Sequence, residues 1–181
     1  MFTCLKSVVR KKLLAQRRND FKITKSLKKS LKKFTYKFDK NFEEVMQHCA
    51  SKPRKGQNGT WIQDDIVEAY MILHSMGIAH SIESYKDGKL VGGLYGLSIG
   101  KVFCGESMFA NENDASKSAY TVLVKNLKKW GYDFIDCQVP TDHLKSLGAK
   151  EVSRNYFLKR LAKSNMDEAK ESWKVDRSII D

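Results

Sequence analysis

The sequence predicts an α+β fold in which a mixed β-sheet is flanked by helices and preceded by a basic helical segment. Three observations lead to this prediction. The first third of the chain combines lysine-rich segments with apolar residues at helical spacing. The rest reads as strand-like and helical segments in the order β-β-β-α-β-α-β, an order typical of helices packed on a sheet. The 181 residues, 41% of them hydrophobic, suffice for one domain with a buried core.

The N-terminal region is predicted to be basic and mainly helical. Residues 1–18 contain no acidic side chain and suit an amphipathic helix, although a targeting segment, a membrane-surface helix or a poorly ordered start are alternatives. The apolar positions of this stretch are Leu5, Val8, Val9 and Leu13. Residues 21–34 predict a second helix with lysines over its remaining surface. Its apolar positions are Ile23, Leu27, Leu31 and Phe34.

The middle of the chain is predicted to lead into a sheet. A short strand at residues 36–38, a helix at residues 41–50 and a basic, glycine-bearing loop come first. Thr60 is placed to cap a helix that starts near Gln63 and ends at Gly77.

Three strands are expected next. Residues 79–87 and 89–100 flank Asp87 and Gly88, a dipeptide that is a strong signal for a β-hairpin. Residues 99–109 form the third strand, which Gly100 separates from the second.

Helix and strand then alternate to the end of the sheet. Residues 113–130 predict an amphipathic helix with Asn113 as its N-cap, and residues 132–138 a short buried strand. A short helix ends at Gly148, and residues 150–161 read as a strand that turns helical. We expect three regions: a basic N-terminal region over 1–59, a catalytic domain over 60–162, and a polar, fraying tail over 163–181.

Positive charge is concentrated in the first third of the chain. The net charge is +12. Residues 1–60 carry 17 lysines and arginines against 4 acids, whereas residues 61–181 carry 16 against 17. Localised positive charge of this kind indicates a polyanionic partner such as nucleic acid. An anionic membrane surface and a solvated lysine face remain alternatives.

Cysteine usage and hydropathy favour a cytoplasmic protein. The four cysteines are widely spread and form no C-x-x-C pair, so we expect free thiols and no metal site. No apolar run approaches the roughly 20 residues that span a bilayer, and no signal-peptide core is evident at the start. We therefore expect no membrane association. A monomer is the default expectation for the oligomeric state.

Acidic and amide residues interrupt two predicted core strands. Glu106 lies inside KVFCGESMF, and Asp136 and Gln138 flank a cysteine in DFIDCQ. Alternation along a strand would place Asp136 and Gln138 on one face. Burying such groups is costly unless they are hydrogen-bonded, so they form either a satisfied polar network or a site that binds an amine.

A family resemblance emerges from these stretches together with others. GTWI, EAY, HSIE, LVGGLYG, FCGESMF, N-A-S-K, IDCQ and H-x-x-SLGA occur in the order typical of bacterial leucyl/phenylalanyl-tRNA–protein transferases, which the chain resembles over roughly Lys22 to Leu161. The resemblance implies a GNAT-like catalytic domain, in which the sheet splays to admit an acyl donor. It also implies no cofactor, and the sequence contains no Q/R-x-x-G-x-G/A pyrophosphate loop.

The resemblance implies a specific reaction. Leucine, phenylalanine or methionine would pass from aminoacyl-tRNA to the N-terminal arginine or lysine of an acceptor protein, which marks that protein for degradation. An aminoacyl ester is already activated, so the enzyme must position the amine, remove a proton and stabilise the oxyanion. We expect Gln138 to orient the amine as a hydrogen-bond acceptor, Asp136 to fix the Gln138 amide, and Glu106 to attract the cationic acceptor side chain.

The resemblance also assigns the two ends of the donor. Seven apolar positions match the family's donor side-chain pocket, although each alone suits plain core packing: Leu94, Phe103, Met108, Tyr120, Leu123, Leu127 and Ile135. Trp61 and Tyr70 match aromatic positions near the terminal adenosine, where a ring can stack on the base, and Trp61 alternatively anchors a helix in the core. The lysines expected to bind tRNA phosphates are Lys28, Lys29, Lys32 and Lys33.

The resemblance stops before Lys22. The family's W-W-S-P-type stretch has no counterpart here, and no tryptophan precedes Trp61. We therefore expect a shortened or divergent N-terminal region, which a truncated product, a start that compensates with charge, or an inactive relative would explain. Two rival functions follow: a tRNA-binding module without catalysis, and a GNAT-like enzyme that uses a small acyl donor.

Overall fold

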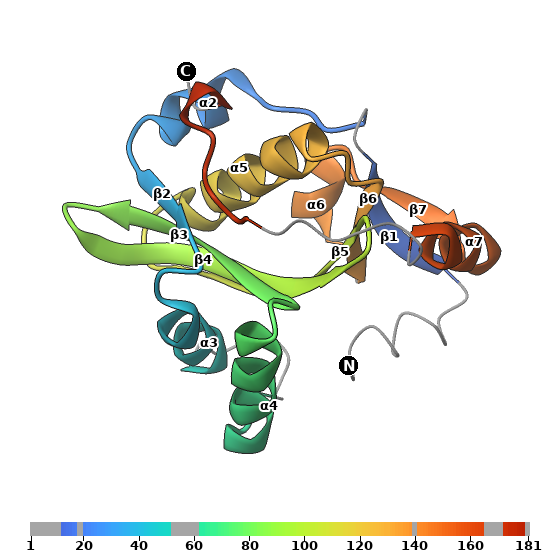
Figure 1. Cartoon of the computed structure of the whole chain (residues 1–181). Coiled ribbons are helices and arrows are strands. Elements are labelled where there is room, and N and C mark those ends of the chain that lie inside the picture. The colour runs from blue at the N-terminus through green and yellow to red at the C-terminus, as the bar shows by residue number, and fades with distance from the viewer. Residues whose placement is uncertain (1–11, 18–19, 52–61, 139–140, 165–171, 180–181) are drawn as a thin grey trace.

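The structure is a computed structural model that describes residues 12–17, 20–51, 62–138, 141–164 and 172–179. Seven described strands form one mixed sheet in the order β2-β3-β4-β5-β6-β1-β7 (Figure 1). The strands are β1 (Lys12–Arg17), β2 (Thr35–Phe38), β3 (Ala79–Lys86), β4 (Lys89–Ile99), β5 (Val102–Ala110), β6 (Phe134–Gln138) and β7 (Lys150–Ser153). The described helices are α2 (Lys25–Leu31), α3 (Phe42–Ser51), α4 (Asp64–Ser75), α5 (Ala115–Lys129), α6 (Asp142–Ser146) and α7 (Arg154–Ser164). The predicted α+β class is confirmed.

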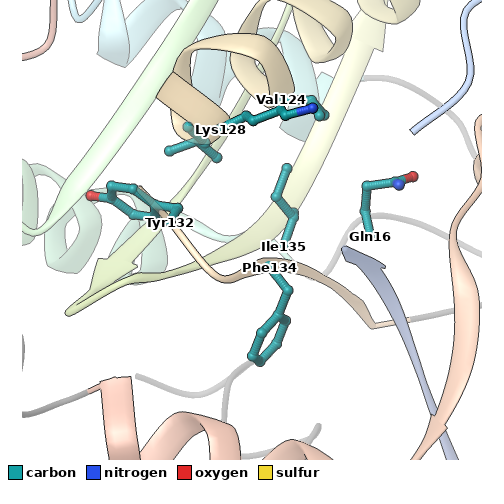
Figure 2. Close-up of a pocket in the computed structure, with 7 residues that line it drawn as sticks. Gln16, Val124, Lys128, Tyr132, Phe134 and Ile135 are labelled. Carbon is teal, nitrogen blue, oxygen red and sulfur yellow. The ribbon is translucent and has the colours of Figure 1, made fainter. Parts of the chain in front are cut away.

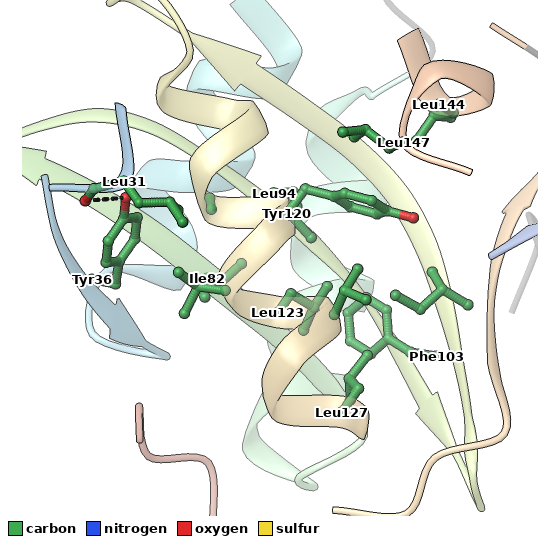
Figure 3. Packing of buried hydrophobic residues seen from close by; sticks show 14 of the residues in the cluster. Leu31, Tyr36, Ile82, Leu94, Phe103, Tyr120, Leu123, Leu127, Leu144 and Leu147 are labelled. Atoms are coloured by element: carbon green, nitrogen blue, oxygen red, sulfur yellow. Dashed lines mark hydrogen bonds between the residues drawn. The ribbon is translucent and has the colours of Figure 1, made fainter. Parts of the chain in front are cut away.

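Helices cover both faces of the sheet and define two cores. Side chains of α2, α5 and α6 pack with one face of the strands, and we call this set, which includes Leu31, Leu94, Phe103 and Leu127, the α5-side cluster (Figure 3). Side chains of α3, α4 and α7 pack with the other face, together with Tyr95 and Cys104, as the α3-side cluster. Figure 1 shows the sheet running between these two layers.

The predicted hairpin is present. Asp87 and Gly88 join β3 to β4 with φ values of 51° and 78°, the left-handed backbone that a tight two-residue turn requires. Of the pairings in the described sheet, β5 with β6 is the parallel one, and α5 makes the connection between these two strands. The sheet is therefore mixed, as predicted.

The predicted helix over residues 1–18 is wrong for Lys12–Arg17, and residues 1–11 lie outside the described residues. Strand β1 pairs with β6 on one side and β7 on the other. Leu13 and Leu14 are both buried but belong to the two different clusters. A strand covered on both faces shows adjacent apolar residues rather than alternation, so its short apolar run was indistinguishable from one side of a helix. The division of the chain at residue 60 stays a prediction, although β1 and β2 belong to the same sheet as the later strands.

Helix starts follow local capping chemistry. The Thr24 hydroxyl caps α2 by accepting a hydrogen bond from the Leu27 backbone N–H at 3.2 Å. Helix α4 starts after Gln63, as predicted, whereas Thr60 lies outside the described residues. The N-cap of α5 is Asp114, with φ of 65°, and not the predicted Asn113. Asp114 instead accepts a hydrogen bond from the Ser30 hydroxyl at 2.9 Å, which ties the start of α5 to α2.

The tail was expected to fray, and for residues 172–179 this expectation is wrong. This segment packs along α5 and ends in a 3-10 helix, η1 (Arg177–Ile179). None of the described helices is long and apolar enough to cross a membrane.

Close approach between β4 and the start of α5 depends on a glycine. A Cβ atom built at Gly92 would lie 2.6 Å from the Ala115 Cβ and 3.0 Å from the Ala115 backbone. Neither neighbour can rotate away, because a Cβ and a helix backbone have no rotamer freedom. A substitution must therefore push α5 off the sheet.

We expect Gly92→Ala to lower the free energy of unfolding by about 1–3 kcal/mol through this overpacking. Urea unfolding of both proteins measures the difference. Gly105→Ala is the matched control, because a Cβ atom there meets the Asp136 carbonyl oxygen at an ordinary 3.5 Å. Equal losses for the two variants would contradict the packing explanation.

Candidate active site

The candidate site lies where the parallel strands β5 and β6 part. Their pairing covers Val102 with Phe134, Phe103 with Ile135, and Cys104 with Asp136. Beyond these pairs, β5 continues beside β4 while β6 continues beside β1. Glu106 on β5 and Gln138 on β6 lie two residues beyond the last pair, to which Asp136 belongs. The structure therefore brings all three predicted catalytic residues together.

The Gln138 side chain bridges the gap between the strands. Its Nε2 donates a hydrogen bond to the Gly105 carbonyl oxygen at 2.9 Å and another to Glu106 Oε2 at 3.3 Å. Both partners are hydrogen-bond acceptors, so the atom that faces them is the amide nitrogen. The amide oxygen of Gln138 therefore points away from Gly105 and Glu106. Glu106 and Gln138 are each 9% exposed, so both keep a small accessible surface.

The backbone of Gln138 is held in a left-handed conformation. Its φ is 57°, which is uncommon for a residue other than glycine and costs about 1–3 kcal/mol. Asp136 Oδ1 accepts a hydrogen bond from the Gln138 backbone N–H at 2.9 Å, which favours this turn. The expected contact of Asp136 with the side-chain amide is replaced by this contact with the backbone, and the amide bonds to Glu106 instead.

Asp136 and Gln138 do not follow the alternation that we predicted. In the register of the two strands, Asp136 is opposite Ala15 of β1, whereas Gln138 is opposite Leu14 because of a register shift. Leu14 and Ala15 belong to opposite clusters, so the bulge brings Gln138 level with a residue of the α5 side. Asp136 is completely buried and can reach a bound molecule only through its neighbours.

Cys137 lies between these residues, in surroundings that disfavour its thiolate form. Burial raises the pKa of its thiol to about 12, and Tyr120 is 3.4 Å from the sulfur. At neutral pH the side chain is therefore the thiol, and only the thiolate is strongly nucleophilic. Burial also raises the pKa of Tyr120 well above 10, so its hydroxyl stays protonated.

The residues of the predicted donor pocket gather in one place. All seven belong to the α5-side cluster or pack against it, with Met108 partly buried at the strand that carries Glu106. Figure 3 shows Leu94, Phe103, Leu123 and Leu127 packed together between α5 and the sheet. The α5-side cluster therefore adjoins the hydrogen-bonded pair of Glu106 and Gln138, which we call the polar bridge.

A small cavity adjoins this cluster. It measures about 10 Å³, the space of one water molecule, and Leu127 and Ile135 are among its lining residues. Figure 2 shows Ile135 directed toward Val124 of α5 and Phe134 directed to the opposite side of β6. Gln16 of β1 also lines the cavity, is 1% exposed, and was missed because the sequence around it suggested a surface helix.

The residues predicted to bind tRNA are only partly brought together. Four lysines on and just after α2 are exposed on the α5 side of the sheet: Lys28, Lys29, Lys32 and Lys33. Tyr70 of α4 is buried on the other side, where its ring packs edge-on against Tyr95 with centroids 5.3 Å apart. Trp61 lies outside the described residues.

Sequence comparison identifies relatives of the chain. A family model described as leucyl/phenylalanyl-tRNA protein transferase matches residues 15–162. The leucyl/phenylalanyl-tRNA--protein transferase of Sulfurimonas denitrificans is 63% identical over 157 residues, which cover 87% of this chain and 69% of that protein. Those of Nitrosospira multiformis and Nitrosomonas europaea are 49% and 53% identical and cover 78% and 68% of this chain. The chain spans only 61% and 52% of the length of these last two relatives.

A structural comparison gives a more distant similarity. The C-terminal domain (DUF2156) of a putative lysylphosphatidylglycerol synthetase from Agrobacterium fabrum superimposes with a TM-score of 0.46 at 12% identity. The superposition covers 93% of this chain and 55% of that one.

We expect Asp136→Ala to lower the free energy of unfolding by about 1–3 kcal/mol, because it removes the acceptor that holds the Gln138 backbone. Asp136→Asn keeps an acceptor oxygen at the same place and should lose less than half as much. Urea unfolding at neutral pH compares the three proteins. If both variants were equally unstable, the charge of Asp136 and not its hydrogen bond would be the important feature.

Proposed function

The chain belongs to the leucyl/phenylalanyl-tRNA protein transferase family, and from this membership we propose that it transfers an amino acid from aminoacyl-tRNA to the N-terminus of a protein. The donors are leucine, phenylalanine and methionine, and the acceptors begin with arginine or lysine. The product is marked for degradation. The protein acts in the cytoplasm as a monomer.

One observation carries the proposal beyond family membership. The polar bridge of Glu106 and Gln138 stands at the parting of β5 and β6, next to the apolar α5-side cluster. An aminoacyl ester offers an apolar side chain beside a reactive carbonyl, and the acceptor offers a cationic side chain beside an amine. These two molecules match the two parts of the site.

The reaction is an aminolysis of an ester. The neutral α-amine of the acceptor attacks the ester carbonyl carbon, so that a C–N bond forms and the C–O bond to the tRNA ribose breaks. The amine loses one proton and the ribose oxygen gains one. The α-amine has a pKa of about 8, so a usable neutral fraction exists at pH 7 without a strong base.

Gln138 positions the amine. Its nitrogen end is engaged by Gly105 and Glu106, which directs the amide oxygen to accept a hydrogen bond from the incoming amine. An amide is too weak a base to remove the proton, so water or the ribose hydroxyl completes the transfer. Asp136 is a positioning residue, since it is fully buried and holds the Gln138 backbone.

Glu106 selects the acceptor through its charge. A partly shielded carboxylate favours a guanidinium or ammonium group, because charge-assisted hydrogen bonds are about twice as strong as neutral ones. The hydrogen bond from Gln138 to Glu106 Oε2 fixes the carboxylate next to the amine position. The first side chain of the acceptor and its amine are thus bound by neighbouring groups.

The donor is bound at both ends. The α5-side cluster accepts the side chain, and a methylene more or less there is worth only about 1–3 kcal/mol, so leucine, phenylalanine and methionine are all tolerated. The four lysines on and just after α2 contact tRNA phosphates on the same side of the sheet. Trp61 remains a proposed partner of the terminal adenosine, whereas Tyr70 is not, because its ring is buried on the other side of the sheet.

Peptide transfer tests this function. Purified protein is incubated with phenylalanyl-tRNA and a peptide beginning with arginine, and mass spectrometry should detect the added phenylalanine. Glu106→Gln removes a charge-assisted contact and should reduce kcat/KM for the arginine peptide by about 10–100-fold. Absence of transfer above a buffer control, with folded protein and intact donor, would refute the proposal.

Two controls separate the rival functions. A peptide beginning with glutamate should not be modified, since Glu106 would repel it. Gln138→Ala should abolish most transfer but leave tRNA affinity within about twofold, whereas a non-catalytic tRNA-binding module would show no transfer with either protein. Tight binding of coenzyme A would instead favour a small acyl donor.

Salt dependence of tRNA binding tests the lysines. Lys29→Gln combined with Lys33→Gln should reduce the slope of log affinity against log salt by about 2, because each phosphate contact contributes about one unit. Filter binding at several salt concentrations measures the slope. Lys159→Gln on α7 is the matched control, since this exposed lysine lies on a helix of the other face. Equal slopes for both variants would exclude α2 as the phosphate-binding helix.

A further inference from the structure

Residues 172–179 form a strap along α5, beyond residue 162, where the family match ends. Figure 1 shows this red segment passing alongside α5 on the face of the sheet that carries the α5-side cluster. Trp173 and Val175 of the strap pack against that cluster. The apolar residues Trp173, Val175 and Ile179 in this largely polar segment are the sequence signal that it docks on the protein.

Trp173 is the centre of an aromatic group. Its ring stacks on His80 with centroids 3.8 Å apart and planes 16° apart. His80 is itself fixed, since Nδ1 lies 2.8 Å from Asp39 Oδ2 and Nε2 lies 2.9 Å from the Gly77 carbonyl oxygen. Four further rings surround the indole at centroid distances between 5.1 and 6.2 Å: Phe38, Phe103, Trp130 and Tyr132.

One of these rings, that of Phe103, belongs to the predicted donor pocket. Phe103 is 1% exposed and lies level with Ile135 of β6, another pocket residue. The Phe103 ring lies against the backbone of Gly96, where a Cβ atom would come within 2.6 Å of it. The β4 backbone at Gly96 blocks movement of the Phe103 ring in that direction. The Trp173 ring, whose centroid lies 5.9 Å from that of Phe103, restricts the ring from the strap.

Polar contacts anchor the strap to α5. The Asp176 carboxylate forms an ion pair with Lys129, and its backbone N–H donates to Asn126 Oδ1 at 3.1 Å. The hydrogen bond from Lys129 lowers the pKa of Asp176 to about 2, so the ion pair persists at neutral pH. Lys125 also donates to the Ile179 carbonyl oxygen. Both lysines lie on α5, which carries the pocket residues Leu123 and Leu127.

We propose that Trp173 is a positioning residue that sets the size of the donor side-chain pocket by restricting Phe103. This inference rests on the proposed transfer function. Without the indole, Phe103 gains space to move away from the pocket, which then accepts a larger donor side chain. The strap thereby adjusts donor preference without touching the donor.

Donor preference is the measurement that tests this role. Transfer rates from leucyl-tRNA and phenylalanyl-tRNA are compared for wild type, Trp173→Ala, Trp173→Phe and Lys174→Ala. We expect the ratio of kcat/KM for phenylalanine over leucine to rise about 10-fold in Trp173→Ala, the size of a one-methylene difference in a pocket. Trp173→Phe should give a smaller rise. Lys174→Ala, an exposed neighbour on the same strap, should not change the ratio.

A merely structural role gives a different result. If Trp173→Ala reduced kcat/KM for both donors equally and left their ratio within about twofold, the proposal would be overturned. Thermal unfolding confirms that each variant is folded. Should Trp173→Ala fail to fold, Trp173→Phe decides by the same ratio.

A binding measurement separates this inference from the proposed function. Leucinamide and phenylalaninamide are titrated into wild type and Trp173→Ala, and NMR chemical shifts give the ratio of the two dissociation constants. If the wild type transferred no amino acid, the proposed function would fail, but a shift of this ratio toward phenylalaninamide would still support the role of Trp173. An unchanged ratio, or no binding of either amide, would overturn it.

Discussion

The parting of β5 and β6 is the constraint on which the candidate site depends. Strands that separate leave backbone groups without ladder partners, and such groups are costly when buried. Two side chains replace the missing bonds: the Gln138 amide donates to the Gly105 carbonyl oxygen, and Asp136 accepts from the Gln138 N–H. The polar residues in these strands thus have a structural reason to be there. The same hydrogen bonds hold Gln138 and Glu106 in place, and the proposed reaction needs both residues.

The two covered faces of the sheet explain how the apolar α5-side cluster comes to lie beside the hydrogen bond between Gln138 and Glu106. Met108 follows Glu106 closely on β5 and packs against the α5-side cluster, whereas Asp136 lies level with Ala15 of the α3-side cluster. Because of the register shift between β1 and β6, Gln138 and Asp136 do not lie on the same face of the sheet. One irregularity therefore separates a buried positioning carboxylate from an amide that keeps some exposure.

Sequence reasoning predicted most of the fold, because periodicity and turn chemistry are local. The Asp87–Gly88 hairpin and α5 are in their expected places. It failed at β1, whose apolar residues face two cores, and at Gln138, whose bulge depends on the partner strand. Trp173 was also missed, because docking of a polar tail depends on the groups it meets in space. These errors arise from tertiary contacts, which no local pattern contains.

The left-handed backbone of Gln138 points to a balance between stability and function. A residue held at φ of 57° costs free energy, and glycine would avoid that cost, but glycine has no amide to bridge the strands. Strain of this kind persists only where surrounding contacts over-determine the conformation. Here Asp136 holds the backbone, while Gly105 and Glu106 hold the side chain. The proposed donor pocket follows the same principle at a distance, since Gly96 and Trp173 restrict Phe103 from separate elements. Precise placement, and not a strongly activated group, is therefore what this fold contributes to the proposed reaction of an already activated ester.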